Sequence, residues 1–65
     1  MKITVNGETA EIRSATLAAA IEELGYGEAR VATAVNETFV PSSLRTGHEL
    51  SPGDRLEILA PRQGG

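Results

Sequence analysis

The residues with the clearest chemical potential are the last two, Gly64 and Gly65, because neither carries a side chain. A carboxylate on a diglycine can pass through a narrow enzyme channel, since no Cβ atoms obstruct it. We therefore expect Gly65 to be modified covalently at its carboxyl group, with Gly64 as its necessary neighbour. Two terminal glycines arise by chance in roughly 0.5% of chains, so the preceding elements must support this prediction.

The rest of the chain offers no catalytic constellation. It has no cysteine, which excludes disulfides, zinc-cysteine sites and iron–sulfur ligation. His48 is the only histidine, and the acidic residues have no metal-ligand spacing. The sequence predicts no catalytic residues, no metal site and no bound cofactor, and therefore a protein that is acted upon by enzymes.

Size and charge limit the partners. A chain of 65 residues forms one domain with a thin core. The net charge is -3, its six basic residues are spread along the chain, and only two residues are aromatic, so nucleic acid is not an expected partner. No apolar run approaches the ~20 residues that cross a bilayer, and no signal-peptide layout opens the chain. We expect no membrane association, a cytoplasmic location, and proteins or small molecules as partners.

The first half predicts a hairpin and a helix. Residues 2–13 alternate in polarity around Asn6-Gly7, a pair typical of a type I′ turn, with Val5 opposite Glu8. The apolar residues of 17–24 recur at helical spacing, with Thr16 or Ser14 as N-cap and Gly25 after the helix. This helix should cover one face of the hairpin.

The second half predicts three short strands. Residues 31–36 should face the core through Val31, Thr33 and Val35, which leaves Ala32 and Ala34 facing outward. Residues 39–41 should form an edge segment, and 42–50 an irregular stretch with one 3₁₀ turn. A type II turn at Pro52-Gly53 should lead into a strand at 55–60.

That last strand places one leucine on the wrong face. Leu56, Ile58 and Ala60 share the predicted inner face, whereas Leu59 falls on the outer face. A single exposed leucine is ordinary. Beside Ala32 and Ala34, however, Leu59 could form a small partner-docking patch at the base of the tail.

The order of these elements predicts an α+β, β-grasp (ubiquitin-like) fold, with a mixed sheet and one covering helix. The first and last strands would be parallel neighbours, which requires a crossover such as the predicted helix. We expect a β-grasp domain at 1–60 and a flexible diglycine tail at 61–65, which reaches at most ~17 Å if extended.

The whole chain resembles the ubiquitin-like sulfur carriers, most closely the ThiS family of thiamin thiazole biosynthesis. The matching segments are Lys2-Ile3-Thr4-Val5-Asn6-Gly7, Val31-Ala32-Thr33-Ala34-Val35-Asn36, Phe39-Val40-Pro41, Gly53-Asp54-Arg55-Leu56-Glu57-Ile58-Leu59-Ala60-Pro61 and Gln63-Gly64-Gly65. Two positions differ from the family pattern. Glu37 stands where the family often has glycine, which bears on the turn geometry, and Ser42 stands where it often has a basic residue.

The resemblance implies a sulfur carrier. A ThiF-like adenylating enzyme would use ATP and Mg²⁺ to convert Gly65 into an acyl-adenylate, and a persulfide sulfur donor would then leave a C-terminal thiocarboxylate. Thiazole synthase ThiG would be the acceptor. Pro61, Arg62 and Gln63 would contact the channel of the activating enzyme. Because the chain has no cysteine, any sulfur must be carried on its C-terminus.

Three alternatives stay open. The small subunit of molybdopterin synthase has the same fold and terminal chemistry but a different acceptor. A conjugating modifier would pass through the same acyl-adenylate and end as an isopeptide. A passive β-grasp interaction module would not need the terminal glycine at all.

Overall fold

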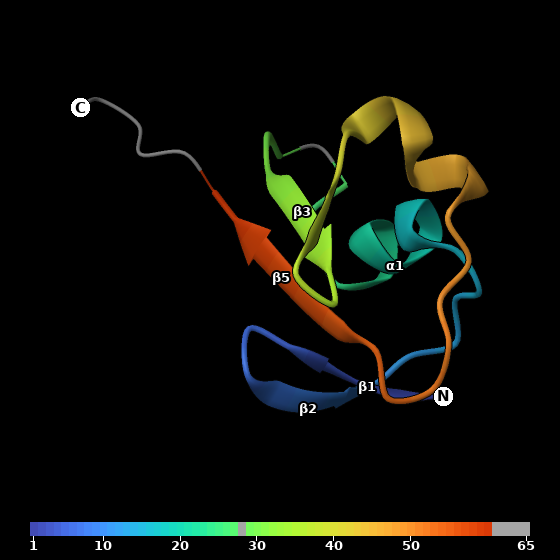
Figure 1. The fold of residues 1–65 in the computed structure, drawn as a ribbon. Helices are drawn as coiled ribbons and strands as arrows, with labels where there is room; N and C mark the ends of the chain where they lie inside the picture. The colour runs from blue at the N-terminus through green and yellow to red at the C-terminus, as the bar shows by residue number, and fades with distance from the viewer. Residues whose placement is uncertain (28, 61–65) are drawn as a thin grey trace.

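A mixed sheet with one covering helix forms the molecule, which a computed structural model describes over residues 1–27 and 29–60. The elements are β1 (Lys2–Val5), β2 (Glu8–Glu11), α1 (Leu17–Glu23), β3 (Ala32–Val35), β4 (Thr38–Val40), the 3₁₀ segment η1 (Ser42–Gly47) and β5 (Arg55–Leu59). The strand order is β2-β1-β5-β3-β4. Strands β1 and β5 are parallel, and the other neighbours are antiparallel (Figure 1). This is the predicted β-grasp arrangement, which is therefore confirmed.

The hairpin of β1 and β2 has the predicted register. Val5 pairs with Glu8 and Ile3 with Ala10. The turn residues Asn6 and Gly7 have φ values of 51° and 87°, as a type I′ turn requires. The two-residue turn thus sets which side chains of the hairpin face the core.

The helix α1 begins and ends as its sequence predicts. The Thr16 side chain caps the N-terminus by accepting a hydrogen bond from the Ala19 amide at 3.2 Å. Gly25, with a φ of 94°, follows the last turn. Leu17, Ala20 and Ile21 are buried, so this face of α1 covers the sheet and its packing holds a short helix that lacks favourable end charges.

The core lies between α1 and the sheet. Its buried hydrophobic residues are Ile3, Ile12, Leu17, Ala20, Ile21, Val35, Val40, Leu50, Leu56 and Ile58. Thr33 is buried among them, and its hydroxyl donates to the Val40 carbonyl at 2.8 Å and accepts from Arg45 Nε at 3.0 Å. Arg45 also donates to the Val31 carbonyl at 2.6 Å, so η1 is fastened to the start of β3.

The strand β5 differs from its prediction at one end. Leu56 and Ile58 are buried as expected, and the turn before them has Gly53 at a φ of 87°. The predicted strand at 55–60 is one residue too long, because β5 ends at Leu59, and Ala60, which was placed on the face of Leu56 and Ile58, is exposed. The last pairing with β3 joins Leu59 to Ala32, so Ala60 lies beyond the paired part of the sheet.

A second tight turn joins β3 to β4 despite an unfavourable residue. Asn36 and Glu37 have φ values of 51° and 72°. The turn therefore keeps its positive-φ geometry with glutamate in place of glycine. For a residue with a Cβ atom, the left-handed conformation is unfavourable by roughly 1–2 kcal/mol of free energy. Glu37 gains only an exposed ion pair with Arg55 at 3.5 Å in return.

Replacing Glu37 by glycine should therefore stabilise the protein. We expect Glu37→Gly to raise the free energy of unfolding by about 1 kcal/mol, measured by urea denaturation. The matched control is Gly7→Ala at the other turn. A Cβ there meets no atom within 4 Å, so the expected loss of about 1 kcal/mol is purely conformational. A Glu37→Gly variant no more stable than the parent would contradict the argument.

A carboxylate clamp fixes the connection from β2 to α1. Glu23 accepts hydrogen bonds from the Arg13 amide at 3.0 Å, the Ser14 amide at 3.0 Å and the Ser14 hydroxyl at 2.6 Å. The Ser14 hydroxyl, followed by the Arg13 amide, lowers the pKa of Glu23 below its ordinary value of 4.5. In the folded state, the ionised carboxylate of Glu23 therefore makes stronger hydrogen bonds to Arg13 and Ser14 than the protonated form does.

This clamp predicts a pH dependence of stability. Because folding lowers the pKa of Glu23, its contribution is complete above pH 4.5 and is lost as the pH falls through the lower folded value. The free energy of unfolding of the parent should exceed that of Glu23→Gln at neutral pH, and the difference should shrink in acid. Urea titrations at several pH values measure it. In a Ser14→Ala background, the difference in free energy of unfolding between Glu23 and Glu23→Gln should be smaller. If that difference does not change with pH in the parent, the proposed role of the Glu23 carboxylate is wrong.

Candidate functional site

The predicted modification site lies outside the described residues. Gly65, Gly64, Gln63, Arg62 and Pro61 all fall in the segment 61–65, after the last described residue. Their assigned roles stay predictions. What the structure describes is the base from which this segment departs.

That base is the end of β5 beside the start of β3. Leu59 is the last residue of β5 and is 70% exposed. The antiparallel register places Ala32 directly opposite it, also exposed. Ala34 lies two residues further along β3, half-buried and opposite Glu57. The structure thus brings together the three small or apolar residues that the sequence placed on the outer face.

Phe39 extends this group and was not singled out from the sequence. It pairs with Ala34 on the side of β3 away from β5, and it is 65% exposed. The signal was present in the alternation of β4, because an inward Val40 requires its neighbour Phe39 to face outward. We call Ala32, Ala34, Phe39 and Leu59 the outer-face patch.

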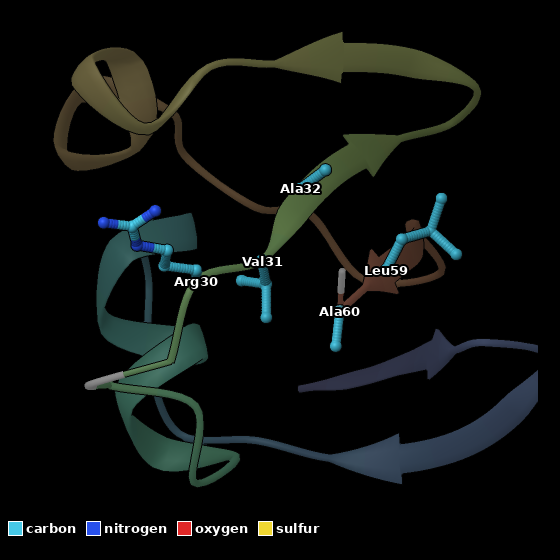
Figure 2. A pocket seen from close by; sticks show the side chains of 5 residues that line it. All are labelled: Arg30, Val31, Ala32, Leu59 and Ala60. Carbon is cyan, nitrogen blue, oxygen red and sulfur yellow. The ribbon is translucent and has the colours of Figure 1, made fainter. Parts of the chain in front are cut away.

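A shallow hollow of about 360 Å³ adjoins the patch at the end of β5. It is lined by Arg30, Val31, Ala32, Leu59 and Ala60 (Figure 2). Figure 2 shows Leu59 and Ala60 on one side and the segment leading into β3 on the other. Apolar surface with one guanidinium at its border suits an apolar side chain from a protein partner that also carries an acidic group.

Charged side chains border the patch along β5. Glu57 lies two residues before Leu59 on the same face of β5 and is exposed. Arg55 lies two residues before Glu57 and forms the ion pair with Glu37. An apolar centre with a charged border is the usual anatomy of a protein-protein contact. The patch can therefore contribute binding energy through its centre and orientation through its border.

The described residues include no group of three or more His, Asp or Glu side chains placed to hold a metal ion. None of the helices in the described part of the chain is long and apolar enough to cross a membrane.

A family model for the ThiS family matches residues 3–65. The chain belongs to the ThiS family. The match includes all but the first residue of β1 and the whole segment 61–65, so it covers the elements on which the sequence prediction depended. Membership supports a role as a sulfur carrier that enzymes of thiamin biosynthesis act upon, rather than a role as a catalyst.

A solved structure gives the ThiS-family fold independent support. The crystal structure of the thiamine biosynthesis protein ThiS from Geobacter metallireducens superimposes with a TM-score of 0.83. The two chains are 23% identical, and the match covers 100% of each. At this identity the likeness concerns the fold. Comparison with curated protein sequences gave no match.

Proposed function

We propose that this chain carries sulfur as a thiocarboxylate on Gly65 and donates it to the thiazole ring of thiamin. The observation that carries the proposal is the ThiS-family match over residues 3–65, which includes the diglycine. The absence of cysteine from the sequence supports it, since no thiol on the chain can hold the cargo.

The chemistry requires activation by a partner. A carboxylate is a poor electrophile, so its oxygen first attacks the α-phosphorus of ATP, with Mg²⁺, and pyrophosphate leaves. The terminal sulfur of a protein persulfide then attacks the acyl-adenylate, and AMP leaves. A thiol cleaves the resulting S–S bond, is itself oxidised to a disulfide, and releases the thiocarboxylate. A ThiF-like enzyme, a persulfide donor and thiazole synthase ThiG supply these steps, and the carrier supplies recognition and reach.

The geometry at the end of β5 supports a carrier that is recognised by its partner enzymes and presents its C-terminus to them. β5 is held between β1 and β3, and it leads directly into the segment 61–65 from a surface that carries Leu59 and the hollow. A partner that docks on the outer-face patch would therefore have the tail delivered to it from an adjoining point. Glycines at 64 and 65 would enter its channel, with Pro61, Arg62 and Gln63 at the entrance.

We predict that activation requires a free carboxyl group on Gly65. After incubation with ATP, Mg²⁺, a ThiF-like enzyme and a persulfide donor, intact mass spectrometry should show one oxygen replaced by sulfur on Gly65. A chain without Gly65, or with one residue added after it, should show no exchange while its circular dichroism is unchanged. Exchange in either variant would overturn the proposal.

The same experiment separates the alternative functions. Covalent adducts of higher mass would indicate a conjugating modifier, and an unmodified chain would favour a passive module. Adding ThiG or a molybdopterin synthase large subunit then tests which acceptor removes the sulfur. We expect transfer with ThiG.

We predict that the activating enzyme docks on the outer-face patch. Leu59→Asp and Phe39→Asp should each weaken binding to the ThiF-like enzyme at least about tenfold, because apolar anchors dominate such contacts. Stability should change by only about 0.5 kcal/mol, since both side chains are exposed. The control is Leu44→Asp on η1, because Leu44 is 60% exposed and is not part of the patch. Isothermal titration calorimetry measures the affinity of each variant for the enzyme. If all three variants lose affinity equally, the patch is not the docking surface.

A further inference from the structure

The side chain of Asn6 makes a two-point contact with β5 near the base of the tail. Its Nδ2 donates to the Ile58 carbonyl at 3.2 Å, and its Oδ1 accepts from the Ile58 amide at 2.8 Å. The contact joins residues 52 positions apart in the sequence. One side chain thus satisfies both backbone groups that Ile58 turns toward β1.

This contact continues a hydrogen-bond ladder that the backbone of β1 cannot complete. The Thr4 amide donates to the Asp54 carbonyl at 3.0 Å, and the Asn6 amide donates to the Leu56 carbonyl at 2.9 Å. The next position in this alternating series is Ile58. The chain has by then turned at Asn6 and Gly7, so no backbone group of β1 is left to pair with it.

We propose that Asn6 is a positioning residue for the tail, because its amide adds one rung to the β1–β5 ladder and holds β5 to its end. On the other side of β5 the pairing with β3 reaches Leu59. With Asn6, both sides of the strand are therefore held to nearly the same point. Without it, the β1 side would be free beyond Leu56, and the last residues of β5 could pivot. The proposal rests on the proposed function, since it concerns how the tail is delivered.

Asparagine meets two demands at this position. The backbone φ of 51° lies in the left-handed region, which asparagine tolerates better than most residues. The primary amide supplies one donor and one acceptor side by side, in the spacing of a peptide group. Aspartate would keep the acceptor and lose the donor, and glycine would keep the turn and lose both.

The chain contains its own matched control in Asn36. Asn36 also begins a positive-φ turn at 51°, and its Oδ1 accepts from the Arg55 amide at 2.9 Å while its Nδ2 donates to Asp54 Oδ1 at 3.1 Å. It thus binds the first residue of β5, at the far end from the tail. Asn6→Gly and Asn36→Gly make the same chemical change in the same kind of turn at opposite ends of β5.

The test compares these two variants in two measurements. Amide hydrogen exchange by NMR should show Ile58 exchanging about tenfold faster in Asn6→Gly, through local opening, and unchanged in Asn36→Gly after correction for global stability. With a ThiF-like enzyme, ATP–pyrophosphate exchange should show kcat about tenfold lower for Asn6→Gly, because a misdirected tail lowers the productive fraction. KM should change little, since the outer-face patch is intact. Asn36→Gly should resemble the parent.

Each outcome decides the inference. Ile58 protection that survives Asn6→Gly, or an equal loss of kcat in both variants, would overturn the positioning role. If Asn6→Gly does not fold, both glycine variants are made in the Glu37→Gly background, which we expect to be more stable, and Ile58 exchange should again rise for Asn6→Gly alone. If the enzyme does not activate the parent chain, the proposed function is wrong, but the contact between Asn6 and Ile58 is still tested. The amide hydrogen exchange measurement needs no partner enzyme.

Discussion

The structure depends on β5 lying between β1 and β3. This strand contributes Leu56 and Ile58 to the core, and each side of it is bonded to a different half of the chain. On one side it pairs in parallel with β1, and on the other it pairs antiparallel with β3. The asparagine that begins each tight turn adds a side-chain bond to it, Asn6 at Ile58 and Asn36 at Arg55. The last strand therefore joins two hairpins that otherwise share few contacts.

The sequence predicts what is decided locally. Asn6-Gly7 and the alternation around it specify the first hairpin and its register, and Thr16 with Gly25 specifies the limits of α1. The β-grasp order follows from those elements, because a parallel neighbour needs a crossover. The exposed Leu59 was also recognisable, since period-two alternation fixes its face once Leu56 and Ile58 are assigned inward.

What the sequence does not reveal depends on contacts between distant segments. Phe39 joins the outer-face patch only because β4 pairs with β3 in one particular register. Ala60 was placed in the last strand, on the face of Leu56 and Ile58, because the alternation in the sequence continues past Leu59, where the pairing with β3 ends. The bond from Asn6 to Ile58 could not be inferred from a motif, since the same Asn-Gly pair serves equally well as a simple turn. In each case the missing information is where a neighbouring strand starts or stops.

The parallel pairing of β1 with β5 also has a consequence for biosynthesis. The bonds from Thr4 to Asp54 and from Asn6 to Leu56 each link positions 50 apart, so the sheet cannot close while the later residues are still inside the ribosome. A nascent or prematurely terminated polypeptide that lacks β5 has two hairpins and no strand to join them. Such a fragment lacks Leu56 and Ile58 and cannot assemble the core. Completion of translation thereby becomes a condition for folding.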